Sequence, residues 1–220
     1  MIYKCKVDFE KESLRYKSLL ASVDDERKVQ IDKLFQVHDK IRTLLSRKLT
    51  EYAICHFANL PLSSLSFGKE KYGKPKLLSH SKIFFNVSHC DSWIVCAVDE
   101  KPIGLDIEKI TSLNWDTLEI FCSTSERNKL KKSKCPEFQY YQYWTIKEAM
   151  LKLIGTGLLT DPRKVMVFFL KGSLIKVNFE NKEWQGESIR TDDWYVLSAV
   201  NTNNISKSIL VSPDRFYEWF

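Results

Sequence analysis

The sequence repeats one strand-like pattern about half a chain apart, and this repeat limits the folds available to it. Residues 93–98 read Trp-Ile-Val-Cys-Ala-Val, and residues 194–200 read Trp-Tyr-Val-Leu-Ser-Ala-Val. A helical pattern precedes each of them. Two unrelated β-strands can look alike by chance, but such spacing also indicates a chain built from two similar units. The repeat predicts a pseudo-two-fold duplication of two α+β halves, residues 1–102 and 103–220, with the active site at their seam.

Periodicity assigns the elements of these halves. Helical spacing of apolar residues covers 24–57, where Asp24 or Asp25 could cap the start, and 140–154, which ends at Gly155. Residues 111–138 show the weakest pattern, with a run of lysines at 129–134. Alternating or short apolar runs predict strands at 2–8, 83–86, 93–98, 103–107, 165–170, 173–179 and 194–200. Mixed elements of this kind predict an α+β fold.

Composition excludes several classes of protein. The longest uninterrupted apolar runs, 93–98 and 165–170, are far shorter than the roughly 18 residues of a membrane span. Charged residues follow the first few positions, which argues against a signal peptide. The six cysteines have no C-x-x-C spacing, and the four histidines add no zinc-ligand pattern. We therefore expect a cytoplasmic protein with reduced thiols that is not bound to a membrane. The net charge of +6 favours an anionic partner only weakly.

Acidic residues form the most informative cluster. Asp106 and Glu108 alternate with Leu105 and Ile107, so both carboxylates share one strand face. Paired carboxylates suit Mg²⁺, although an exposed edge strand would give the same pattern. In the second helical segment Glu148 precedes Lys152 by one turn. The pair is either a surface ion pair or a third carboxylate with a phosphate-binding lysine.

Three further motifs carry polar side chains that could contact phosphate. They are Phe85-Asn86-Val87-Ser88-His89, Tyr72-Gly73-Lys74-Pro75 and the Arg42-Thr43 pair in the first helical segment. Each motif by itself is also compatible with a structural role, as a turn cap or a helix surface. No G-x-S-x-G motif surrounds Ser88, so a serine hydrolase is not indicated.

The ordered set of motifs resembles the 4′-phosphopantetheinyl transferases of the Sfp type. The set runs Tyr-Gly-Lys-Pro, Phe-Asn-x-Ser-His, Gly-x-Asp-Ile-Glu and Trp-x-x-Lys-Glu-Ala-x-x-Lys-x-x-Gly-x-Gly-Leu, and the resemblance extends from Arg42 to Leu158. Members of this family activate peptide and polyketide synthetases, as in antibiotic biosynthesis. The resemblance also implies a duplicated architecture, in agreement with the repeat.

The resemblance implies a role for each matched position. Asp106, Glu108 and Glu148 match ligands of Mg²⁺, or of Mn²⁺ in its place, and Glu148 is also the expected general base. Lys152 would contact the pyrophosphate. The other matched coenzyme A contacts are Arg42, Thr43, Lys74, Ser88, His89 and Lys147. Arg27 and Gln30 stand where some members carry lysines, and Cys90 stands where many carry serine.

The implied reaction moves the phosphopantetheine arm of coenzyme A to a serine of an apo carrier protein and releases adenosine 3′,5′-bisphosphate. The expected partners are coenzyme A and a peptidyl or acyl carrier domain, with no nucleic acid and no membrane, and the expected state is a monomer. Residues 111–136, which include Trp115, Phe121 and the 129–134 lysines, are the expected docking surface. Two alternatives are a Mg²⁺-dependent nucleotide phosphotransferase or pyrophosphohydrolase and a non-enzymatic nucleotide-binding protein.

Overall fold

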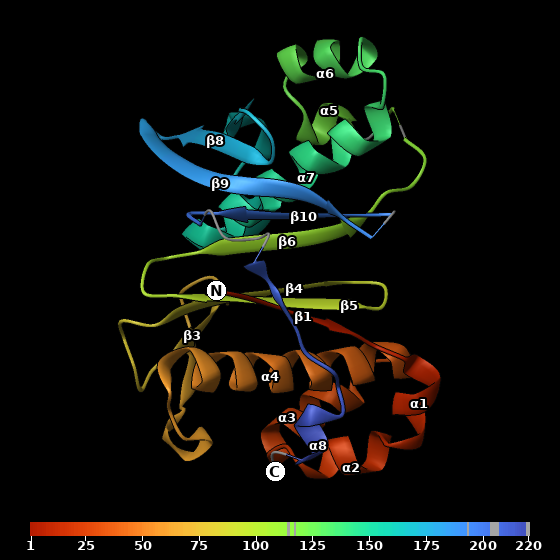
Figure 1. The fold of residues 1–220 in the computed structure, drawn as a ribbon, viewed down its shortest axis with the longest axis vertical. Coiled ribbons are helices and arrows are strands. Elements are labelled where there is room, and N and C mark those ends of the chain that lie inside the picture. Colours follow the sequence, from red (N-terminus) through yellow and green to blue (C-terminus); the bar gives the residue numbers. More distant parts are fainter. Residues whose placement is uncertain (114, 117, 193, 203–206, 219–220) are drawn as a thin grey trace.

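The computed structural model describes residues 1–220 except 114, 117, 193, 203–206 and 219–220, which include two positions of the expected docking surface. Figure 1 shows the described chain as two halves stacked along the long axis. The elements of the first half are β1 (Ile2–Lys6), α1 (Phe9–Leu14), α2 (Tyr16–Ala21), α3 (Asp25–Asp32), α4 (Val37–Ala58), β2 (Phe67–Lys69), β3 (Pro75–Leu77), β4 (Phe84–Cys90) and β5 (Trp93–Asp99). Those that follow are β6 (Gly104–Lys109), α5 (Leu118–Phe121), α6 (Thr124–Lys131), α7 (Pro136–Ile154), β7 (Met166–Phe169), β8 (Leu174–Phe179), β9 (Lys182–Thr191), β10 (Tyr195–Val200), β11 (Ile209–Leu210) and α8 (Arg215–Glu218).

Both halves have the same order of core elements, so the predicted duplicated α+β fold is confirmed. One sheet has the order β11-β1-β5-β4 and the other has β6-β10-β9-β8-β7. In each half a first strand pairs antiparallel with the last strand, and a long helix lies between them in sequence. Thus β1, α4, β4 and β5 correspond to β6, α7, β9 and β10.

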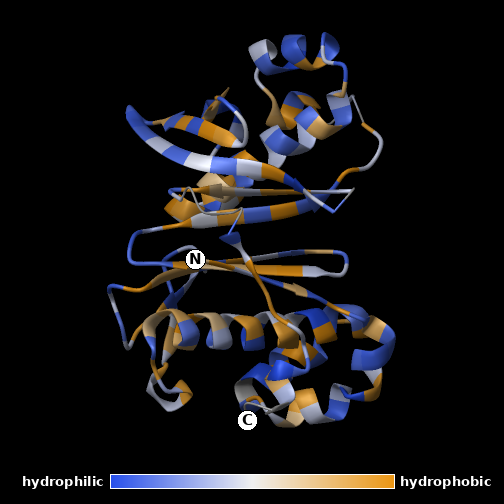
Figure 2. Cartoon of the chain, in the orientation of Figure 1, coloured by the Kyte–Doolittle hydropathy of each residue, from blue (hydrophilic) through white to orange (hydrophobic). Residues whose placement is uncertain are grey.

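The repeated pattern corresponds to β5 and β10, the central strands, which are buried on both faces. Alternate residues of β5 (Trp93, Val95, Ala97) join Tyr195, Leu197 and Ala199 of β10 in a hydrophobic core at the seam. In Figure 2 hydrophobic colour runs along the strands on both sides of this seam. The tryptophans themselves do not correspond: Trp93 is 4% exposed and its counterpart is Tyr195, whereas Trp194 is 61% exposed.

The ends of the long helices are set by capping side chains, extended backbone, proline and glycine. The predicted helix over 24–57 is divided into α3 and α4. The Asp24 side chain caps α3 by accepting a hydrogen bond from the Arg27 backbone. Extended backbone at Gln36 then precedes α4. Helix α7 has proline at its start and ends at Gly155 with φ of +77°, a left-handed conformation that glycine adopts without strain.

Gly104 lets β6 approach α7 closely. A Cβ atom at this position would lie 1.9 Å from the Ala149 carbonyl oxygen, so any larger residue would push the strand away from the helix. This close packing brings the acidic face of β6 to α7, where Glu148 and Lys152 lie.

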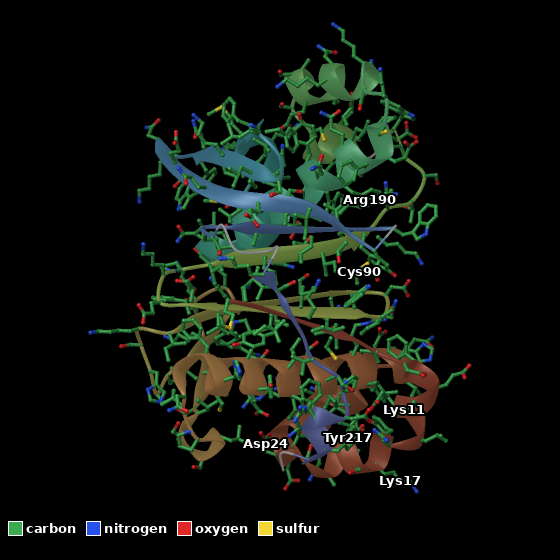
Figure 3. All side chains as sticks on the ribbon, in the orientation of Figure 1. Lys11, Lys17, Asp24, Cys90, Arg190 and Tyr217 are labelled. Carbon is green, nitrogen blue, oxygen red and sulfur yellow. The ribbon has the colours of Figure 1, made fainter. Side chains whose placement is uncertain are left out.

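The end of the chain returns to the first half. Strand β11 pairs parallel with β1, and Phe216 of α8 is buried in the same core as α4. Lys11 and Arg15 both bind Asp214, and the Tyr217 hydroxyl donates to Glu12; Figure 3 labels Lys11 and Tyr217. Residues 209–218 therefore pack with the first half, although the predicted division assigned them to 103–220. Among the described helices none is long and apolar enough to cross a membrane.

Candidate active site at the seam

A cleft of about 880 Å³ opens between the two halves. Its walls come from α3, α4, β2 and β4 of the first half and from β6 and α7 of the second half. The cleft therefore lies at the seam, where the duplication predicted a site. The lining residues used below are Arg27, Thr43, Ser46, Arg47, Thr50, Phe67, Lys69, Ser88, His89, Asp106, Glu108, Trp144, Glu148 and Lys152.

Asp106 lies at the centre of the second-half wall. Strand alternation turns Leu105 and Ile107 into the seam core and leaves Asp106 and Glu108 on the opposite face of β6. Asp106 is only 3% exposed. Its Oδ1 accepts hydrogen bonds from Lys152 Nζ at 2.5 Å and from Ser88 Oγ at 2.7 Å. Its Oδ2 is buried and has no partner in the described part of the chain. The carboxylate thus keeps one oxygen available for a cation.

Two carboxylates near Asp106, those of Glu108 and Glu148, have raised pKa values. Burial, with the negative charges of Asp106 and Glu148, raises the pKa of Glu108 to about 7. Burial and Asp106 also raise the pKa of Glu148, which Lys152 opposes. A cation between these groups would remove the repulsion, and hard carboxylate oxygens suit Mg²⁺. Among the described residues, however, no three His, Cys, Asp or Glu side chains are close enough to hold an ion alone.

Replacing Glu108 by glutamine should stabilise the metal-free protein, and increasingly so as the pH rises. The folded-state pKa of Glu108, about 7, exceeds its ordinary value of 4.5, so the folded protein binds a proton that the unfolded chain releases between these values. The wild type therefore loses stability as the pH rises through this window, and Glu108→Gln avoids that loss. We expect a gain of about 1–3 kcal/mol at pH 8 and almost none at pH 4. Urea unfolding in a chelator at both pH values measures it, and an equal gain at both would contradict the assignment.

The first-half wall supplies positive charge. Arg27, Arg47, Lys69 and His89 line the cleft opposite the carboxylates. Burial and the positive charges of Arg42 and Lys152 lower the pKa of His89. A neutral imidazole can donate one hydrogen bond to an anion, while the lysine and arginine side chains supply charge. The cleft therefore has three carboxylates on one wall and basic side chains on the facing wall.

The structure brings together only part of the predicted site. Thr43, Ser88, His89, Asp106, Glu108, Glu148 and Lys152 all line the cleft, as do Arg27 and Gln30. Ser88 and His89 belong to β4 itself and do not follow the strand. Cys90 lies at the seam (Figure 3), and burial with the nearby carboxylate of Glu108 raises the pKa of its thiol to about 12.

Three predicted coenzyme A contacts lie outside the cleft lining. Lys147 is fully buried and donates to Glu126 Oε2 at 2.7 Å and to the Phe121 carbonyl oxygen at 2.9 Å. It points to α5 and α6 because helical geometry places it 100° from Glu148. Lys74 Nζ donates to the Leu153 carbonyl oxygen at 2.9 Å. Arg42 binds Asp39 and the backbone of Asp91 at the rim.

Sequence analysis missed one face of α4. Thr43, Ser46, Arg47 and Thr50 recur at the spacing of one helix face and line the cleft together. Only Thr43 belonged to a motif, but the same spacing applied from Thr43 onward would have found the rest. Phe67, Phe85 and Trp144 also line the cleft.

The weakly patterned segment forms α5 and α6 at the outer end of the second half (Figure 1). Ser123 and Glu126 make a capping box at the start of α6. Phe121 stacks on Trp144 with ring centroids 4.1 Å apart, which connects α5 to the cleft lining. Trp115 and Ile120 are exposed, and so are all four lysines in 129–134, whereas Phe121 is 3% exposed and was wrongly predicted to belong to the docking surface.

Comparison with known protein families covers both halves. A sequence model of the 4′-phosphopantetheinyl transferase superfamily matches residues 102–200. A second model, of the N-terminal part of 4′-phosphopantetheinyl transferases, matches residues 10–101. The two matches meet between residues 101 and 102.

Individual relatives carry the same name. A 4′-phosphopantetheinyl transferase of Bacillus subtilis is 36% identical over 143 residues, which cover 64% of this chain and 63% of the relative. The 4′-phosphopantetheinyl transferase gsp of Aneurinibacillus migulanus is 33% identical over 144 residues, 64% of this chain and 59% of that one. The L-aminoadipate-semialdehyde dehydrogenase-phosphopantetheinyl transferase of Mus musculus is 23% identical over 216 residues, 82% of this chain and 67% of the mouse protein. The chain thus spans about 60% of the length of its bacterial relatives.

Proposed function

The chain belongs to the 4′-phosphopantetheinyl transferase superfamily, and on this premise we propose that it moves the phosphopantetheine arm of coenzyme A to a serine of apo carrier proteins. Adenosine 3′,5′-bisphosphate is the second product. The observation that carries the proposal is the seam cleft, where Asp106, Glu108 and Glu148 face a basic wall. The carriers are peptidyl or acyl carrier domains of nonribosomal peptide or polyketide synthetases.

Coenzyme A occupies the cleft with its pyrophosphate near Lys152 and its remaining phosphate on the basic wall. Lys152 Nζ already lies 2.9 Å from Ser88 Oγ, so both groups can donate to the same phosphate oxygens. His89 and Arg27 line the same wall. Lys147 is left out of this site because its ammonium is held by Glu126.

Asp106, Glu108 and Glu148 would hold Mg²⁺ or Mn²⁺ when coenzyme A is bound. The unpartnered Oδ2 of Asp106 and the raised pKa values of Glu108 and Glu148 support this donor set. When bound, the ion would neutralise negative charge on the pyrophosphate. Phosphate oxygens of coenzyme A would add to these ligands, because the three carboxylates of the described structure are not close enough together to hold an ion alone.

The residues of the cleft would divide the chemistry between them. Glu148, half-buried with a raised pKa, is positioned to accept the proton of the carrier serine as its oxygen attacks the β-phosphorus. Lys152 offsets the negative charge that develops on the leaving phosphate. Coenzyme A and the serine are held in one cleft, which makes the attack effectively intramolecular.

The carrier docks beside α5 and α6 in this proposal. Exposed Trp115 and Ile120 supply apolar contact, and the lysines of α6 attract an acidic partner. A folded carrier domain of about 100 residues has a radius of gyration near 13 Å, so it can reach α5 while its serine enters the cleft. One chain supplies both walls of the cleft, and all six cysteines are free thiols, which supports a cytoplasmic monomer.

Reversing the charge of Lys129, Lys131, Lys132 and Lys134 to glutamate should lower kcat/KM for the carrier by about tenfold at low salt. The KM for coenzyme A should not change, because these side chains are remote from the cleft lining. The control reverses Lys171, Lys176 and Lys182, which lie just before β8, on β8 and on β9, away from α5 and α6. Equal losses in both variants, or a loss that persists at high salt, would contradict this docking surface.

Mass spectrometry tests the proposed function directly. The protein is incubated with coenzyme A, Mg²⁺ and apo carriers of the peptidyl, acyl and fatty-acid types. We expect one carrier to gain the mass of the phosphopantetheine arm and adenosine 3′,5′-bisphosphate to appear in equal amount. Phosphate release without carrier modification would instead indicate a pyrophosphohydrolase, and neither product would indicate a binding protein.

A further inference from the structure

Strands β4 and β6 lie next to each other at the seam but do not pair with each other. Among the described strands, β4 pairs with β5 and β6 pairs with β10, and each is the edge strand at one end of its sheet. Figure 1 shows them on the two sides of the seam. In an antiparallel ladder every second residue turns its N–H away from the partner strand. The outer edge of β6 therefore needs hydrogen-bond acceptors from outside its own sheet.

Asn86 of β4 supplies such an acceptor. Its side-chain Oδ1 accepts a hydrogen bond from the backbone N–H of Leu105 at 2.9 Å. Asn86 is 6% exposed and Leu105 is completely buried, so water has little access to this bond. An N–H group that loses its acceptor in such a place costs the energy of its desolvation. The side chain of Asn86 thus ties the edge of β6 to β4, where backbone pairing does not.

The next residue along β6 is Asp106. Ser88 lies two positions after Asn86 and so on the same face of β4, and its hydroxyl donates to Asp106 Oδ1 at 2.7 Å. Strand β4 therefore holds β6 at two consecutive residues, by the backbone of Leu105 and by the side chain of Asp106. Before them, Gly104 packs closely against α7 because it has no Cβ atom. The part of β6 that carries Asp106 is thus held by β4 and by α7.

We propose that Asn86 is a positioning residue, which keeps the Asp106 carboxylate in place to bind a divalent cation. Asn86 lies outside the cleft lining, so it would act through β6 and not by contact with coenzyme A. Without its acceptor, the Leu105 N–H would turn toward water, and this shift of β6 would move Asp106 away from Ser88. Loss of a group that orients a metal ligand typically costs about 10–100-fold in metal affinity. The inference rests on the proposed function for the role of Asp106, but not for the contact between β4 and β6.

Hydrogen exchange of the Leu105 amide, followed by NMR without metal or coenzyme A, tests this contact. The rate is measured relative to the amides of β10, which corrects for a general loss of stability. Asn86→Leu has a side chain of similar size but no acceptor, and we expect the Leu105 amide to exchange about tenfold faster. Asn86→Asp keeps an acceptor oxygen, so its Leu105 amide should stay protected. Unchanged relative exchange in Asn86→Leu would overturn the proposal.

Mn²⁺ binding in the presence of coenzyme A, without a carrier protein, tests the effect on Asp106. We expect Asn86→Leu to weaken this binding by about tenfold or more. The kcat for transfer should fall by a similar factor, with little change in the KM for the carrier. Asn86→Asp should bind Mn²⁺ more tightly than Asn86→Leu, because it keeps the acceptor and adds no positive charge. Equal affinities of the two variants would overturn the proposal.

Tyr217→Phe is the matched control for a general loss of stability. It removes the hydrogen bond from Tyr217 to the buried Glu12, between α8 and α1, and both residues lie outside the cleft lining. It should lower the melting temperature but leave the relative exchange of Leu105 and the Mn²⁺ affinity unchanged. Equal losses of Mn²⁺ affinity in Tyr217→Phe and Asn86→Leu would overturn the proposal. A wild type that binds no Mn²⁺ would refute the proposed cation site instead, and the exchange of Leu105 would still decide whether Asn86 holds β6.

Discussion

Asp106→Asn should reduce carrier modification by about a thousandfold or more while leaving the fold intact. Asparagine has the shape of aspartate and can still accept hydrogen bonds from Ser88 and Lys152 through its Oδ1. It removes the negative charge next to the unpartnered Oδ2, the group best placed to bind a cation. The lost attraction to Lys152 is offset by relief of the repulsion that raises the pKa values of Glu108 and Glu148. We therefore expect the melting temperature of the metal-free protein to change by only a few degrees.

Ser88→Ala is the matched control for this experiment. It removes one hydrogen bond to Asp106 and keeps every charge of the cleft. We expect a much smaller loss of transfer, roughly tenfold, with the KM for coenzyme A raised. Carrier modification is followed by mass spectrometry, and Mn²⁺ binding in the presence of coenzyme A gives a readout independent of turnover. Near-normal transfer by Asp106→Asn, or unchanged Mn²⁺ binding, would refute the carboxylate site.

The acidic part of the site was predictable because it depends on short-range geometry. Strand alternation places Asp106 and Glu108 on one face whatever lies opposite. The repeated strand pattern also predicted that the two halves meet at a seam, but it did not predict which residues of β5 and β10 correspond. The Trp-to-Trp match suggested one alignment, but burial aligns Trp93 with Tyr195 and leaves Trp194 in solvent. A sequence pattern shows that a strand is apolar, whereas the contacts across the seam decide which residue of it is buried.

Lys147 and Lys152 differ in a way that the sequence did not predict. Lys147 and Lys152 occupy one helix and one motif, yet Lys152 enters the cleft and Lys147 points to α6. The deciding residue, Glu126, lies in a segment with little apolar periodicity, because α5 and α6 are too short, at four and eight residues, to repeat an apolar pattern. Likewise β9, with its alternation broken by Gly186 and Glu187, and the β2–β3 hairpin gave no strand signal. Polar contacts between residues far apart in the sequence produce no periodic pattern in it, so they could not be predicted from the sequence.

Lys147→Met should strongly destabilise the protein, by about 3–5 kcal/mol, and lower its melting temperature by roughly 10 °C. Lys147 is completely buried, and the side chain of its partner Glu126 is only 7% exposed. Removal of the lysine leaves a buried carboxylate without its counter-charge. The same change frees the Phe121 carbonyl oxygen and loosens the stack of Phe121 on Trp144. Thermal melting followed by circular dichroism measures the loss.

Two comparisons separate this structural role from a role in binding coenzyme A. Lys152→Met, on the same helix but with its side chain 28% exposed, also removes the counter-charge of the buried Asp106, so it should destabilise the protein as well; unlike Lys147→Met, it should abolish most of the transfer in the folded protein. In the double variant Lys147→Met with Glu126→Met no buried charge remains unpaired, so much of the lost stability should return. At a temperature where Lys147→Met is fully folded, its affinity for coenzyme A should equal that of the wild type. A weaker affinity there, with an unchanged melting temperature, would restore Lys147 to the binding site and refute its assignment as the link between α6 and α7.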